Sequence, residues 1–111
     1  MEEIKKLIVK AVRENLEYTD EMYSQWILGL SVKEVEQSFN IRVALKTSES
    51  PYVDGMEISD VLVKDNTVFL PDYFENTPDL QGSEIKYALA WLKNLGEVCY
   101  IQLDDPLKGK C

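Results

Sequence analysis

The sequence of 111 residues contains no histidine. Histidine is the commonest general base, so its absence excludes Ser-His and Cys-His catalytic arrangements and any zinc site with histidine ligands. The two cysteines, Cys99 and Cys111, are too few for a disulfide framework. No apolar run approaches the ~20 residues of a membrane-spanning helix. We therefore expect no catalytic residues, no bound metal, no cofactor and no membrane partner.

The first residues, "MEEIKKLIVKAVREN", lack the apolar block and the small-residue cleavage site of a signal peptide. Cys99 lies in an apolar strand-like run, typical of a small core residue, and a reducing compartment suits both cysteines. We expect a cytoplasmic protein. The length is close to the commonest domain size, and no linker or internal repeat divides the chain, so we expect one domain over residues 1–111.

Basic residues are scarce in the middle of the chain. Residues 48–80 carry eight acids and one base, Lys64, for a net charge of −7, although the whole chain carries only −8. Residues 1–47 carry −1, and residues 81–111 are neutral. A field of this sign repels nucleic acid and attracts basic partners. We therefore expect a basic protein partner and no direct contact with nucleic acid.

Apolar spacing predicts four helices. Residues 2–17 place Ile4, Leu7, Ile8, Ala11, Val12 and Leu16 on one helical face. A second helix is predicted over about 20–30, with Thr19 as its N-cap, and the capping box "SVKE" at 31–34 predicts a short third helix that ends at Asn40. The fourth covers 84–95, with Ser83 as its cap and Gly96 as its end.

The strand predictions lie between and after these helices. Alternation over 41–46 predicts one strand, and Asp65-Asn66 is typical of a two-residue turn that joins strands 61–64 and 67–70. The apolar parity shifts near Ser59-Asp60, which indicates a bulge. A last strand is predicted over 98–103. The order favours an α+β domain of two layers, with a mixed or antiparallel sheet of about four strands covered on one face by helices.

The stretch "LSVKEVEQSFNI", residues 30–41, resembles the first helix of the helix-turn-helix found in many DNA-binding regulators. The resemblance implies a recognition helix after the turn. The next residues, "RVALKTSESPY", alternate like a strand and then reach Pro51. We therefore favour a capped core helix at 31–39 over a DNA-binding element.

Three carboxylates, Asp54, Glu57 and Asp60, are spaced three apart and raise the possibility of a metal or acid/base site. In an extended strand Asp54 and Asp60 point one way and Glu57 the other. The run also lacks the ligand spacing of an EF-hand loop. We favour carboxylates that face solvent or a partner.

The stretch "LPDYFENTPDL", residues 70–80, combines carboxylates with aromatic rings in a loop-like segment. Tyr52, Tyr73 and Phe74 lie in such acidic runs, where no helical or strand face includes them. Aromatic anchors ringed by carboxylates are typical of a binding surface. The predicted partner-binding residues are Tyr52, Asp54, Glu57, Asp60, Asp72, Tyr73, Phe74, Glu75 and Asp79.

A small acidic protein with such a surface is suited to block a basic one. Basic surfaces in the cytoplasm often belong to nucleic-acid-processing proteins. We hypothesise an immunity protein or antitoxin that neutralises a nuclease-type toxin. The alternatives are a phage-type nucleic-acid mimic that inhibits a host defence protein, an enzyme that uses only carboxylates as glycosidases do, and a small regulator.

Overall fold

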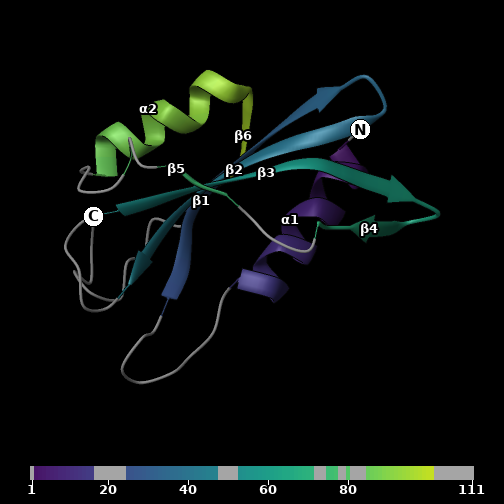
Figure 1. Ribbon diagram of the computed structural model, residues 1–111, viewed down its shortest axis with the longest axis horizontal. Helices are drawn as coiled ribbons and strands as arrows, with labels where there is room; N and C mark the ends of the chain where they lie inside the picture. The colour runs from purple at the N-terminus through teal and green to yellow at the C-terminus, as the bar shows by residue number, and fades with distance from the viewer. Residues whose placement is uncertain are drawn as a thin grey trace.

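The computed structural model describes residues 2–16, 25–47, 53–71, 75–77, 80 and 85–101. Its elements are α1 (Glu2–Leu16), β1 (Gln25–Val35), β2 (Ser38–Thr47), β3 (Val53–Lys64), β4 (Thr67–Phe69), β5 (Glu75–Thr77), α2 (Ile85–Leu95) and β6 (Glu97–Ile101). The strands form one antiparallel sheet in the order β4-β3-β2-β1-β6, and β5 also pairs with β3 (Figure 1). The α+β class predicted from the sequence is confirmed.

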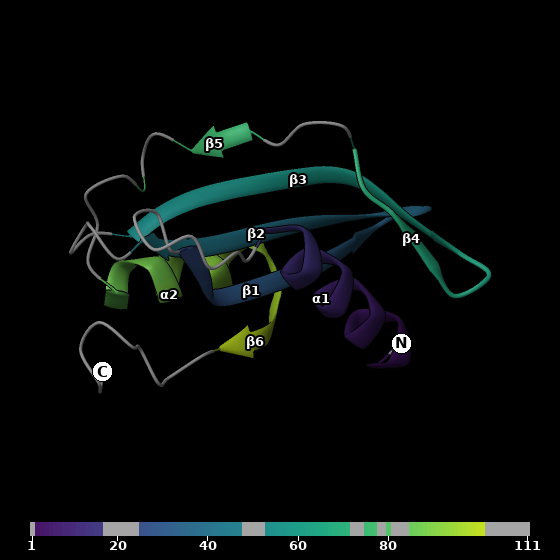
Figure 2. The ribbon, with the colours of Figure 1, turned by 90° about the horizontal axis from the view of Figure 1, so that it is seen from below.

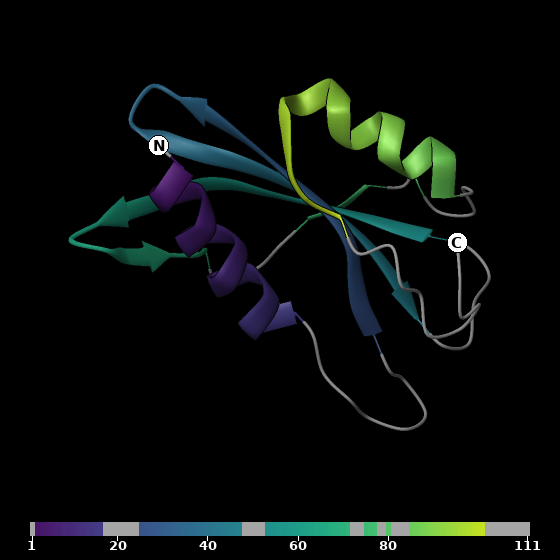
Figure 3. The ribbon, with the colours of Figure 1, turned by 180° about the vertical axis from the view of Figure 1, so that it is seen from behind.

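The two helices cover opposite faces of the sheet. Residues of β2 such as Val43 pack in one cluster with Ile8 of α1, whereas the adjacent Ala44 packs in a second cluster with Leu92 of α2. Successive side chains of a strand point to opposite faces, so the two clusters lie on the two sides of the sheet. Figures 2 and 3 show α1 and α2 on either side of the strands. The sheet therefore has more strands than expected, and each face carries one helix.

Residues 25–47 form the β1–β2 hairpin, so the second and third helices predicted from the sequence are wrong over these residues. A β-bulge lies between Ile27 and Gly29. Because of this extra residue, Ile27 and Leu30 face the same side of the sheet although they are three positions apart. A spacing of three is typical of a helical face, so the sequence pattern resembled a helix. The strand is also buried on both faces, from Ile27 to Val32, so no polar alternation marks it. Thr19, the predicted N-cap of the second helix, lies outside the described residues.

The predicted capping box at 31–34 has a different role. The buried Ser31 hydroxyl donates a hydrogen bond of 2.8 Å to the Leu92 carbonyl. Leu92 is in the last turn of α2, where backbone carbonyls lack helical partners. Ser31 thus caps the carboxyl end of α2, and Asn40 lies within β2. The segment that resembles a helix-turn-helix is a β-hairpin, so the resemblance carries no DNA-binding element here.

The predicted hairpin around Asp65-Asn66 is confirmed. Lys64 pairs with Thr67 across it, and both turn residues have positive φ, 54° for Asp65 and 61° for Asn66, as a type I′ turn requires. The predicted bulge at Ser59-Asp60 is confirmed as well, because the β2–β3 register shifts there. The Asp60 N–H donates to the side-chain oxygen of Asn40 at 3.3 Å, which closes the bulge.

The remaining elements follow the sequence prediction closely. The first and last predicted helices appear as α1 and α2, and the predicted last strand appears as β6, directly after Gly96. Ser83 and residues 102–103 lie outside the described part of the chain. Within that part, neither helix has the length and apolarity that a membrane crossing needs.

Candidate functional site

The acidic positions that the structure describes gather on β3 and its neighbours. We define the acidic edge as Asp54, Glu57 and Asp60 of β3, Asp65 of the following turn, and position Glu75 of β5. Asp54 and Asp60 are exposed, and the Glu57 side chain is 39% exposed. Asp54 lies at a position facing the α1 side of the sheet and Glu57 at one facing the α2 side, as expected for an extended strand. The edge therefore presents charge on both faces.

Strand β5 brings a further acidic position to this edge. Glu75 lies directly opposite Glu57, and Thr77 lies opposite Gly55. Directly opposed acidic positions concentrate negative potential. The other predicted site residues, which are Tyr52, Asp72, Tyr73, Phe74 and Asp79, lie outside the described residues.

Two leucines near the acidic edge, Leu70 and Leu80, pack into the body of the protein. Leu70 packs against the cluster on the α1 side of the sheet. Leu80 is 3% exposed and belongs to the cluster on the α2 side, where it lies over Gly55. A side chain at position 55 would collide with Leu80, so the missing Cβ makes room for this anchor.

Glu57 also has a partner within the protein. The Arg42 Nε atom lies 3.3 Å from a Glu57 carboxylate oxygen, an ion pair without hydrogen-bond alignment. The Arg42 guanidinium also donates to the Trp91 carbonyl at 2.9 Å and lies over the Trp91 ring. Because Arg42 offsets the charge of Glu57, Asp54 and Asp60 are the carboxylates of β3 that present most charge to a partner.

Sequence reasoning missed an exposed apolar pair beside these acids. Leu62 and Phe69 are cross-strand partners in the β3–β4 hairpin, and they are 49% and 52% exposed. The hairpin extends away from α2, so this face of it is not covered by that helix (Figure 1). Asp60, at the bulge within β3, precedes Leu62 by two positions, and Asp65, in the turn, follows it by three. The predicted Asp65-Asn66 turn already set Leu62 opposite Phe69, so the signal was present in the sequence.

The described carboxylates do not form a metal site. Asp54 and Glu57 are on opposite faces of β3, and within the described ranges no three side chains of His, Cys, Asp or Glu come together as possible ligands.

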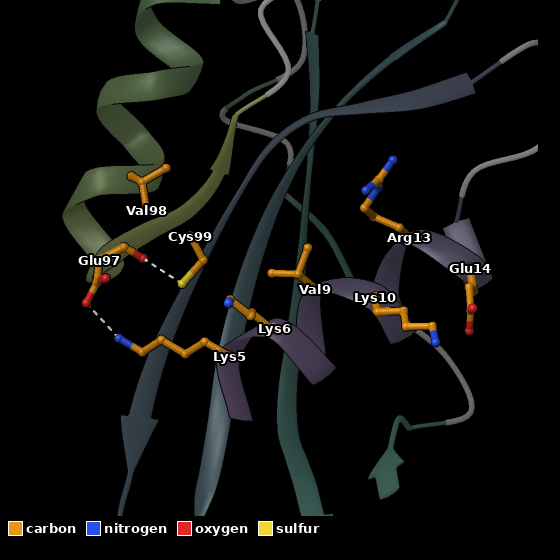
Figure 4. A pocket seen from close by; sticks show the side chains of 9 residues that line it. All are labelled: Lys5, Lys6, Val9, Lys10, Arg13, Glu14, Glu97, Val98 and Cys99. Carbon is orange, nitrogen blue, oxygen red and sulfur yellow. Dashed lines mark hydrogen bonds and ion pairs between the residues drawn. The ribbon is translucent and has the colours of Figure 1, made fainter. Parts of the chain in front are cut away.

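A second surface, also missed from the sequence, lies between α1 and β6. It is a groove of about 670 Å³ (Figure 4). Among the described residues, its charged lining consists of Lys5, Lys6, Lys10, Arg13, Glu14 and Glu97. Lys5 makes an ion pair of 2.7 Å with Glu97 at one end. The groove is thus positively lined in a protein whose net charge is −8.

Cys99 lies in the same groove. It is half-buried and packs against the cluster on the α1 side, so it is less enclosed than a core residue. Burial raises the pKa of the Cys99 thiol, and the nearby Lys5 ammonium acts in the opposite direction. The thiol is therefore protonated at neutral pH.

Comparison of the chain with protein-family models, curated proteins and solved structures gives no match. Functional inference therefore rests on the chemistry of the chain's own surfaces.

Proposed function

We propose that this chain is a protein-binding inhibitor that covers a basic surface of its partner with the acidic edge and the neighbouring β3–β4 hairpin. The observation that supports this most is the exposed Leu62–Phe69 pair flanked by Asp60 and Asp65. Interfaces combine an apolar centre, which contributes most of the binding energy, with a polar rim. The hairpin offers both on one small area.

The charge distribution supports a basic partner. Residues 48–80 carry −7, and negative potential of this kind speeds encounter with Lys- and Arg-rich surfaces and repels acidic ones. Basic clefts are common in proteins that process nucleic acid, since their substrate is a polyanion. We therefore assign the chain as a cytoplasmic immunity protein or antitoxin against a nuclease-type toxin. It acts by occupying the cleft, without turnover.

The proposed binding has two physical stages. Asp54, Asp60 and Asp65 attract the partner over a distance set by the Debye length, about 8 Å at physiological salt. Leu62 and Phe69 then lose water against an apolar part of the partner, which slows dissociation. The paired β2, β3 and β5 hold the edge in an extended form before binding, so little ordering is required on contact.

The test begins with affinity capture from a native lysate with three forms of the protein. These are the wild type, the edge variant Asp54→Asn/Asp60→Asn, and the control variant Glu3→Gln/Glu34→Gln. Both variants lose two negative charges at exposed positions, and asparagine tolerates the positive φ of position 60. We expect the wild type and the control variant to capture the same basic protein at low salt, and the edge variant to capture less of it.

The captured protein is then assayed for nuclease activity with increasing amounts of the chain. Full inhibition at one chain per partner supports the assignment. A partner without nuclease activity, or an active nuclease that the bound chain leaves uninhibited, would overturn the toxin-inhibitor assignment. Equal capture by the edge and control variants would overturn the assignment of the acidic edge as the binding surface.

A further inference from the structure

The groove between α1 and β6 has the form of a small-ligand site. Its volume of about 670 Å³ falls within the roughly 300–1,000 Å³ of typical ligand pockets. Val9 of α1 and Cys99 of β6 supply its apolar lining, and both pack against the cluster on the α1 side of the sheet. A β-bulge in β6 accompanies the groove, because the register with β1 shifts between Val98 and Tyr100. Bulges of this kind turn side chains away from the regular ladder.

The cations of α1 lie along one ridge of the helix. Lys6, Lys10 and Arg13 are spaced i, i+4 and i+7, so they extend over about 10 Å at 1.5 Å per residue. Like charges at this spacing repel each other and weaken a helix. Among the described residues, neither Lys6 nor Lys10 has an ion-pair partner. An anion bound between them relieves this repulsion.

The acids among the described lining residues are fewer than the cations. Glu97 is already paired with Lys5 at 2.7 Å. Figure 4 shows Lys5 and Lys6 extending from α1 toward β6, with the Lys5–Glu97 pair at one end of the groove. Among the described lining residues, Glu14 is then the other acid beside Lys6, Lys10 and Arg13, so the described lining is net positive.

Arg13 adds a cation whose orientation is set by an aromatic ring. The centre of its guanidinium lies 4.7 Å from the centroid of the Tyr100 ring in β6. Stacking on a ring fixes the plane of the guanidinium, and the planar fork suits two-point contacts with phosphate or carboxylate oxygens. The groove thus combines the exposed ammonium groups of Lys6 and Lys10 with one oriented guanidinium.

We propose that this groove binds a small polyanion that carries two or more phosphate or carboxylate groups. The ligand must be small, because a long polyanion such as nucleic acid would extend beyond the groove into the repulsive field of a chain with net charge −8. The site is separate from the acidic edge and does not depend on the proposed inhibitor function. Because its cations are largely exposed, binding weakens as salt screens them.

The test uses isothermal titration of the full chain with pyrophosphate and, separately, with citrate at low salt. We expect saturable binding of one ligand per chain and a ligand-dependent rise in melting temperature. Lys6→Gln/Lys10→Gln removes two charge-assisted contacts and should weaken binding about tenfold or more. The matched control Lys33→Gln/Lys93→Gln removes the same charge at exposed positions of β1 and α2 and should change affinity little.

A second pair of variants tests whether removing a negative charge from the lining strengthens binding. Glu97→Gln removes an acid from the lining and releases Lys5, so it should strengthen binding, whereas Asp54→Asn on the acidic edge should have little effect. Binding of pyrophosphate alone assigns the ligand as a phosphate compound, and binding of citrate alone assigns it as a carboxylate. Absence of saturable binding for both ligands, or an equal loss in the groove and control variants, would overturn the proposal.

Discussion

The guanidinium of Arg42 lies 4.7 Å from the centroid of the Trp91 ring and donates a hydrogen bond of 2.9 Å to the Trp91 carbonyl. One side chain of β2 thereby holds the carboxyl-terminal part of α2 against the sheet, where a positive charge also suits the helix dipole. The same guanidinium reaches Glu57 on β3. Helix position and acidic edge are therefore linked through Arg42.

This link predicts unequal losses at its two ends. Arg42→Gln removes the ring contact, the carbonyl hydrogen bond and the ion pair, so it should lower the free energy of unfolding by about 2–3 kcal/mol. Glu57→Gln removes only a partly exposed ion pair and should cost about 1 kcal/mol or less. Urea denaturation of both variants measures the difference. Equal losses would show that the ring and carbonyl contacts add nothing.

The contact between Gly55 and Leu80 gives a second prediction. A Cβ atom at position 55 would fall 2.8 Å from the Leu80 Cβ atom, closer than real Cβ contacts allow. Gly55→Ala should therefore destabilise the protein by about 1–3 kcal/mol. In the double variant with Leu80→Gly the Cβ atom at position 80 is absent and the clash disappears, so its loss should be smaller than the two single losses together. A strictly additive double variant would mean that Leu80 does not cover Gly55.

Local signals predicted the parts of the fold that depend on neighbours in sequence. The Asp65-Asn66 turn and the bulge at Ser59-Asp60 follow from turn residues and a parity shift within a few positions. Strand β1 depends instead on contacts far along the chain. Its bulge gives the apolar residues a helical spacing. Ser31 stands in a capping-box sequence, but its hydroxyl donates to the distant Leu92 carbonyl.

The candidate surfaces also combine features that the sequence predicts with features that depend on distant contacts. The charge of residues 48–80 was visible as composition, but the opposition of Glu75 and Glu57 depends on the pairing of β5 with β3. The groove could not be seen, because Lys5 and Glu97 are 92 positions apart and meet only when α1 packs beside β6. The pairing of Leu62 with Phe69 was predictable from the hairpin register. That no helix in the described part of the chain covers this pair was not predictable.

The raised pKa of Cys99 predicts a pH dependence. In a Cys111→Ser variant, alkylation of Cys99 by iodoacetamide should reach its half-maximal rate at a higher pH than for free glutathione, because burial disfavours the thiolate. Lys5→Gln should raise that pH further, and Glu97→Gln should lower it. A group whose pKa is raised on folding contributes stability below its unfolded pKa. That contribution is lost as the pH rises through the folded value. A profile that matches glutathione would contradict the burial of the thiol.

The apolar pair predicts a change in dissociation. Phe69→Ala should speed release of the captured partner about 30-fold, which corresponds to about 2 kcal/mol for a buried aromatic anchor. The association rate should change little, since no charge is lost. Tyr87→Ala serves as the control, because Tyr87 is an exposed aromatic residue on α2, 59% exposed and outside the hairpin. Faster release from the Tyr87 variant than from the Phe69 variant would place the contact on α2.

The most direct measurement is the association rate of the captured partner with the edge variant Asp54→Asn/Asp60→Asn and the control variant Glu3→Gln/Glu34→Gln, each at two ionic strengths. The two variants have equal net charge and differ in where the acids were removed. We predict that the edge variant associates more slowly than the wild type at low salt and depends less on salt, whereas the control variant keeps the wild-type rate and salt dependence. If the control variant slows association as much as the edge variant or more, the acidic edge does not guide the partner.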